Sequence, residues 1–135
     1  MMLVAALRDY EATILSMGVL ALLLVVQVVV ADMIGIRSRH LPGTPIDADH
    51  ANPLFRVSRT VANTNESIAA YIILVLFCIF SGADADATGY LSWGFVLARA
   101  GYAVCYYANL QIARSVLFGI SMVMLAGMLV TGFFT

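Results

Sequence analysis

The chain has 135 residues, of which 62% are hydrophobic and only 11% are charged, whereas a soluble domain carries roughly 25% charged residues. This composition excludes an ordinary soluble globular protein. Seven arginines and eight acidic residues leave a formal net charge of -1, which provides no positive field to hold a polyphosphate backbone and so excludes a nucleic-acid partner.

Long stretches without a charged residue dominate the chain. They cover residues 12–31, 67–83, 87–98 and 115–135. Because about 20 apolar residues span a bilayer as a helix, we predict an all-α integral membrane protein, a bundle of four transmembrane helices that forms a single domain over residues 1–135. The helices are predicted at about residues 10–34, 52–80, 90–108 and 112–134.

The first apolar stretch is predicted to stay in the mature protein as a helix. A cleaved signal peptide has a basic start and an apolar run of roughly 7 to 15 residues. Here Asp9 and Glu11 offset the charge of Arg8, and the uncharged run that follows them is longer.

Arginines flank two of the three connections between the predicted helices. Two of them lie in the polar, proline-containing loop at 35–51, and Arg114 lies beside the turn at 109–113. Because basic residues next to membrane spans stay on the cytoplasmic side, both connections are predicted to be cytoplasmic. The acidic turn at 81–89 has no basic residue, so it and both termini are predicted on the opposite side.

Polar side chains recur along the second predicted helix at a helical period. They are separated by 3, 4 and 3 residues, and at about 100° per residue they fall within an arc of roughly 80°. The stripe consists of Arg56, Arg59, Asn63 and Glu66. Arg56 is close enough to the membrane surface to serve as a positive-inside anchor, and Glu66 can form a structural ion pair with Arg99 or Arg59.

The third predicted helix repeats the spacing with Arg99, Tyr102, Tyr106 and Asn109. Arg99 is the most informative of these residues, because it lies too far from either end of the helix to reach bulk water easily. It requires a carboxylate such as Glu66, a water-filled cleft or an anionic ligand. With Arg114 and Ser115 at the start of the fourth helix, the stripes predict a polar cavity that opens to the cytoplasm and suits a small anion with carboxylates.

Two other groups of residues are not predicted to form a site. The first lies in the polar loop and consists of His40, Asp47, Asp49 and His50. Their spacing matches no metal-ligand motif, so no metal site is predicted. The second is Cys78 and Cys105, which lie in apolar stretches and are interpreted as membrane-buried thiols rather than as a disulfide framework.

Two segments resemble a known family. The segment at 55–66 has a hydrophobic-Arg-Val start followed by Arg59, Asn63 and Glu66, and the segment at 99–106 has an arginine followed by tyrosines three and seven residues later. Both patterns resemble the signatures of the membrane-associated proteins in eicosanoid and glutathione metabolism, the MAPEG superfamily, and in particular its microsomal glutathione S-transferases. With the length and the four predicted spans, the resemblance covers essentially the whole chain.

The resemblance implies a homotrimer of left-handed four-helix bundles that binds glutathione in clefts between neighbouring subunits near the cytoplasmic face. The implied glutathione-binding residues are Arg59, Asn63, Glu66, Arg99, Tyr102 and Tyr106. Arg114 takes the position of the family's thiol-activating arginine, and Ser115 resembles the serine of the prostaglandin synthase branch. Arg37 or Arg39 takes the position of the family's basic residue at the end of the first helix.

The implied activity is that of a glutathione transferase, with glutathione peroxidase activity on lipid hydroperoxides as a further expectation. A nearby cation lowers the pKa of a thiol from about 8.5, so Arg114 would stabilise the glutathione thiolate, and Tyr106 or Ser115 would donate a hydrogen bond. The other arginines would hold the two carboxylates of glutathione, and Glu66 would receive its ammonium group. The thiolate would attack a lipophilic electrophile that enters from the membrane lipids.

Two other functions are compatible with the sequence. One is a catalytically silent family member that binds a small anionic ligand or a protein partner, because the motifs indicate binding more directly than turnover. The other is a small transporter or channel subunit, which is disfavoured because a pore needs polar residues along a whole helix face and residues 72–80 are entirely apolar. The absence of lysine and the compact loops favour a bacterial inner membrane as the location.

Overall fold

The computed structural model describes residues 7–135, and all regular secondary structure in this part of the chain is helical. Four long helices follow one another: α2 (Glu11–Arg37), α3 (Pro53–Ser81), α4 (Ala85–Tyr107) and α5 (Gln111–Phe133). The predicted all-α fold class is therefore confirmed. Residues 1–6 of the predicted domain lie outside the described part of the chain.

Three of these helices are long and apolar enough to cross a membrane, namely α2, α3 and α5. This agrees with the prediction of an integral membrane protein. Helix α4 has 23 residues, as many as α5, but Asp86, Arg99 and several tyrosines make it more polar. Its place as a fourth span stays a prediction.

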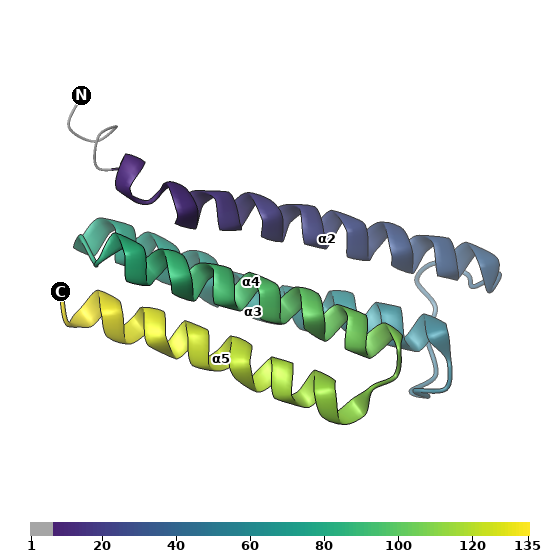
Figure 1. The fold of residues 1–135 in the computed structure, drawn as a ribbon. Coiled ribbons are helices and arrows are strands. Elements are labelled where there is room, and N and C mark those ends of the chain that lie inside the picture. Colours follow the sequence, from purple (N-terminus) through teal and green to yellow (C-terminus); the bar gives the residue numbers. More distant parts are fainter. Residues whose placement is uncertain (1–6) are drawn as a thin grey trace.

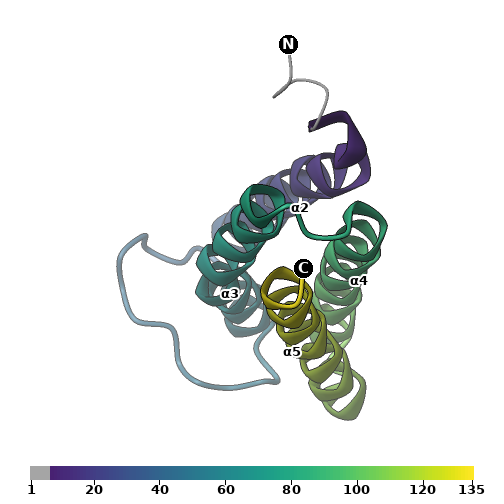
Figure 2. The same ribbon diagram turned by 90° about the vertical axis from the view of Figure 1, so that its left-hand side faces the viewer.

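The four helices run alternately up and down the bundle (Figure 1). The loop at 38–52 and the α4–α5 connection lie at one end, whereas the α3–α4 turn and the carboxyl end of α5 lie at the other (Figure 1). Helices α3 and α4 each pack against both α2 and α5 (Figure 2). The two connections flanked by arginines are thus at the same end of the bundle.

The start of α3 follows from its first residues. The side chain of Asn52 accepts a hydrogen bond from the amide of Leu54 at 2.9 Å, which satisfies one of the free donors at a helix start. Pro53 occupies the first turn, where its missing N–H has no partner to lose. The prediction of a helix from about residue 52 agrees with this start.

The start of α4 differs from the prediction. The carboxylate of Asp84 accepts a hydrogen bond from the amide of Ala87 at 2.7 Å, and the helix begins at Ala85 instead of near 90. Asp86 in the first turn is favourable beside the positive end of the helix dipole. The acidic segment predicted as a turn at 81–89 is therefore mostly helical, because its acidic residues stabilise a helix start.

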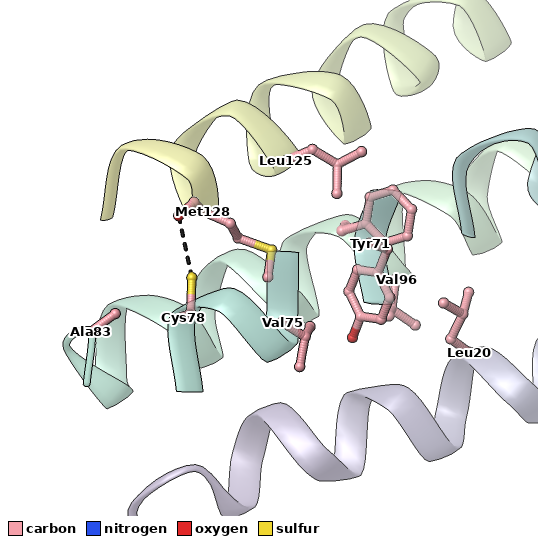
Figure 3. Packing of buried hydrophobic residues seen from close by; sticks show 9 residues of the cluster. Leu20, Tyr71, Val75, Cys78, Ala83, Val96, Leu125 and Met128 are labelled. Carbon is pink, nitrogen blue, oxygen red and sulfur yellow. Dashed lines mark hydrogen bonds between the residues drawn. The ribbon is translucent and has the colours of Figure 1, made fainter. Parts of the chain in front are cut away.

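The apolar core lies in the half of the bundle that contains the α3–α4 turn. It consists of Leu20, Tyr71, Val75, Cys78, Ala83, Phe95, Val96, Leu125 and Met128 (Figure 3). Tyr71 stacks on Phe95 with 4.7 Å between ring centroids, and its hydroxyl shares a hydrogen bond of 2.7 Å with Ser16. This arrangement leaves the loop end of the bundle for polar side chains.

The two cysteines are free thiols in different surroundings. Cys78 is buried, and its thiol donates to the carbonyl of Met128 at 3.2 Å (Figure 3). Cys105 on α4 is only partly buried.

Glycines allow α4 and α5 to approach closely. A Cβ atom at Gly94 would lie 2.6 Å from the sulfur of Met124, and one at Gly101 would lie 3.1 Å from the side chain of Leu117. Such small residues let helix backbones come together in a membrane protein. The contact places Arg99, which lies between the two glycines, near the first half of α5.

We expect Tyr71→Phe to destabilise the bundle by about 0.6 kcal/mol, the average value of a hydrogen bond between membrane helices. The substitution removes the bond to Ser16 and keeps the ring stacked on Phe95. Thermal unfolding in detergent measures the loss. Tyr90→Phe is the matched control, because Tyr90 is 79% exposed, and an equal effect of both substitutions would contradict the prediction.

Candidate functional site

Arg99 is fully buried in the bundle, with 0% of its surface exposed. Its Nη2 donates to the side-chain oxygen of Asn63 at 2.8 Å and more weakly to the hydroxyl of Thr64 at 3.5 Å. The guanidinium carbon lies 4.8 Å from the ring centroid of Tyr102 and 5.9 Å from that of Phe118. Aromatic faces attract a cation at these distances, so the charge is held from three helices.

Two nitrogen atoms of Arg99, Nε and Nη1, are buried and have no hydrogen-bond partner among residues 7–135. A buried polar group without a partner is costly, and a buried charge more so. Glu66 is not among the hydrogen-bond partners of Arg99, which are Asn63 and Thr64, and its side chain is exposed. Arg99 therefore has donor capacity that fits an anion.

The polar stripe of α3 divides between two environments. Asn63 turns toward α4 and contacts Arg99, whereas Arg59 and Glu66 are exposed on the surface of the single chain. Arg56 is partly buried and points to the loop, where its Nη1 donates to the carbonyl of His50 at 2.6 Å. The four residues share the helical spacing, but they do not share one environment. Asn63 faces α4, Arg56 faces the loop, and the other two are exposed.

A cavity of about 200 Å³ lies beside this cluster. It is lined by Asn63, Tyr102, Arg114, Ser115 and Phe118. All but Phe118 are residues predicted for the site, and they come from α3, α4 and α5. Nη1 of Arg114 is buried and has no hydrogen-bond partner in the described chain, so the cavity has a cationic donor available to a ligand.

The hydroxyl groups of the two predicted hydrogen-bond donors are already engaged. Tyr106 lies 4.4 Å below the guanidinium of Arg114, and its hydroxyl shares a hydrogen bond of 3.2 Å with Nε2 of His50. Ser115 lines the cavity, but its hydroxyl donates to the carbonyl of Gln111 at 3.0 Å. Ser115 would have to exchange its partner before it could donate to a bound thiolate, whereas Tyr106 keeps its proton for such a bond when Nε2 of His50 is the donor.

The arginines predicted near the end of the first helix lie apart from the cavity. Arg37 and Arg39 are both exposed and do not line it. A larger cavity of about 360 Å³ lies between the carboxyl end of α2, the loop and the start of α3, and its polar lining includes Asp32, His40 and Ser58. No arginine lines this second cavity, so it suits an anion less well than the first.

Sequence reasoning missed three residues of the site. Thr64 follows Asn63 directly, and Phe118 lies one helical turn after Arg114, so the helical period could have identified both. From the sequence, His50 stands out only as a residue type that can bind a metal. Nothing in the local sequence indicates its contact with Tyr106, because 56 residues separate them.

The site can bind an anionic group and stabilise negative charge. It combines Arg99, which has donors without a partner among the described residues, with Arg114 and the polar side chains that line the cavity. The comparison with protein families agrees with this arrangement. The model of the MAPEG family matches residues 13–134, which is nearly the whole chain and includes both polar stripes. No curated individual protein matches the chain. The family match confirms the resemblance predicted from the two stripes, and the chain belongs to the MAPEG family.

Proposed function

We propose that this protein is a membrane-embedded glutathione transferase. The observation that supports the proposal most strongly is that three buried guanidinium nitrogens at or beside the cavity have no partner within residues 7–135, namely Nε and Nη1 of Arg99 and Nη1 of Arg114. The Arg114 nitrogen belongs to a residue that lines the cavity, and two further lining residues, Tyr102 and Phe118, hold Arg99. Glutathione brings two carboxylates for such donors and supplies the nucleophilic thiol.

Arg99 and Arg114 have separate roles in the proposed reaction. Arg99, oriented by Asn63, holds a carboxylate with its free nitrogens. Arg114 lies in the first turn of α5, where its charge and the positive end of the helix dipole both lower the pKa of a neighbouring thiol. The thiol proton passes to solvent, sulfur forms a bond to the electrophilic carbon, and the leaving group departs with its electron pair.

We further propose that the site is completed by other copies of the chain in a homotrimer. Arg59 and Glu66 are exposed on α3 of the single chain, and ionisable side chains at membrane depth are expensive unless a partner or water covers them. A neighbouring subunit packed on this face would cover both. Glu66 is then available for the ammonium group of glutathione and Arg59 for a carboxylate.

In the proposed arrangement α4 is the fourth span, packed between the apolar helices. The loop at 38–52 and the α4–α5 connection face the cytoplasm, because arginines flank both. The membrane is proposed to be a bacterial inner membrane, in which the lipophilic electrophile dissolves and reaches the site between helices. Lipid hydroperoxides are a second proposed substrate class, with the same thiolate as nucleophile.

Purified protein in detergent tests the proposal. We expect it to bind glutathione by calorimetry, to conjugate it to an activated aryl chloride with release of chloride, and to have three times the chain mass of 14.5 kDa by light scattering. S-methylglutathione is the control, since its sulfur is blocked and it should bind without turnover. Binding of glutathione without conjugation would support the silent family member, and the absence of binding would overturn the proposal.

A further inference from the structure

The end of the loop before α3 is fixed by hydrogen bonds. The guanidinium of Arg56 donates to the carbonyls of His50 at 2.6 Å and of Ala51 at 3.2 Å, and the amide of Ala51 donates to the carboxylate of Asp49 at 2.8 Å. Arg56 therefore does more than anchor α3 at the membrane surface. It determines where the backbone of His50 lies.

The side chain of His50 is held on two sides by aromatic rings. Its ring packs edge-on against Phe55 with 5.1 Å between centroids, and it stacks on Tyr106 at 5.9 Å with an interplanar angle of 23°. Its Nε2 also shares the hydrogen bond of 3.2 Å with the hydroxyl of Tyr106. The imidazole thus has one defined position, and it fixes the position of the Tyr106 ring in turn.

The same Tyr106 ring supports the arginine of the cavity. The guanidinium carbon of Arg114 lies 4.4 Å from its centroid, within the range of a cation–π contact. Arg114 lines the cavity, and its buried Nη1 has no hydrogen-bond partner among the described residues. A continuous series of contacts therefore leads from the loop through His50 and Tyr106 to the guanidinium of Arg114, which lines the cavity.

We propose that His50 is a positioning residue for this site. By holding the hydroxyl and the ring of Tyr106, it fixes the guanidinium of Arg114 in the orientation that stabilises the thiolate, and it couples the loop at 38–52 to catalysis. The inference rests on the proposed function, since the thiolate belongs to glutathione. His50 itself does not line the cavity, so it acts through Tyr106.

Two substitutions separate positioning from simple packing. His50→Phe keeps a ring against Tyr106 and Phe55 but removes the hydrogen bond, whereas His50→Gln places a polar atom at about the reach of Nε2. We expect His50→Phe to lower kcat about fivefold, the usual effect of one neutral hydrogen bond, with KM for glutathione unchanged. His50→Gln should restore most of the loss. His40→Phe is the control and should leave kcat unchanged, because within residues 7–135 the His40 side chain hydrogen-bonds only to Thr44 and it does not line the cavity beside Arg114.

A double-mutant cycle tests whether His50 acts on kcat through Tyr106. In a Tyr106→Phe background, His50→Phe should cause no further loss of kcat, because the hydrogen bond is already absent. A parallel spectroscopic test uses histidine labelled with ¹⁵N in the ring, since the chain has two histidines. Tyr106→Phe should shift the ring nitrogen signals of His50 and leave those of His40 in place.

The results distinguish this inference from the proposed function. If the wild-type protein neither binds nor conjugates glutathione, the proposed function fails and this inference fails with it. If the wild-type protein conjugates glutathione and His50→Phe turns over at the wild-type rate, only the positioning role of His50 is overturned. A lower kcat together with a higher KM for glutathione, neither of which His50→Gln restores, would also overturn the positioning role. Such a result would indicate that His50 is purely structural.

Discussion

Replacing Arg114 by alanine should lower glutathione conjugation about 100-fold, the effect of removing one group that stabilises developing negative charge in an active site. The guanidinium lines the cavity and has a nitrogen without a partner in residues 7–135, so its removal takes away the cation that we propose lies beside the sulfur. The thiol pKa then returns toward about 8.5. We expect the lost activity to be regained in part as the pH rises through this value, because more thiolate forms without help from the protein.

Glutathione should still bind to Arg114→Ala in a calorimeter, because Arg99 and Asn63 remain. Arg114→Lys should recover part of the rate through its charge, but not all of it, because an ammonium lacks the planar face that lies on Tyr106. Arg8→Ala is the matched control, since Arg8 is exposed near the start of α2. Unchanged turnover in Arg114→Ala would disprove the role of this residue in thiol activation.

Replacing Arg99 by methionine should weaken glutathione binding about 100-fold while leaving the unliganded protein at least as stable as the wild type. Hydrogen bonds to charged groups contribute about 1.5–3 kcal/mol, and about 1.4 kcal/mol corresponds to a factor of ten in affinity. Arg99 is buried, and two of its nitrogens have no hydrogen-bond partner in the part of the chain that the structure describes. A buried charge that lacks partners is costly, and an apolar side chain of similar volume removes this cost.

Thermal unfolding with and without glutathione measures both effects in one detergent. Glutathione at 100 times its Kd should stabilise the wild type by about 2.7 kcal/mol and should leave Arg99→Met nearly unaffected. Arg99→Lys keeps the charge without the planar fork and should bind with intermediate affinity. A large loss of stability with unchanged affinity would show that Arg99 is a structural cation and not a ligand-binding one.

The positions of the helices follow closely from the sequence because their signals are local. Uncharged runs and the proline at residue 53 predicted the start of α3 within about a residue. The start of α4 was predicted too late, because the polar segment at 81–89 was interpreted by composition alone. Asp84 there is a helix cap, and the same polar residue types favour both turns and helix starts.

The candidate site was predictable only in part, for a geometric reason. The helical period determines which side chains share a face, and it correctly grouped Arg99 with Tyr102, whose ring lies 4.8 Å from the guanidinium carbon. It does not determine how far each helix is rotated toward its neighbours. As a result of that rotation, Arg99 is buried and Asn63 is partly buried, whereas Glu66 is exposed. The predicted glutathione-binding residues therefore lie partly inside the bundle and partly on its surface.

The sequence by itself determined the membrane class of this protein, its apolar helices and its membership of the MAPEG family, which the match over 13–134 confirms. These properties depend on composition, period and motif spacing, which are local to each helix. Only the tertiary structure decided that Arg99 binds Asn63 and that His50 holds Tyr106. Such contacts join residues 36 and 56 positions apart, and they depend on the packing of whole helices, which no short segment encodes.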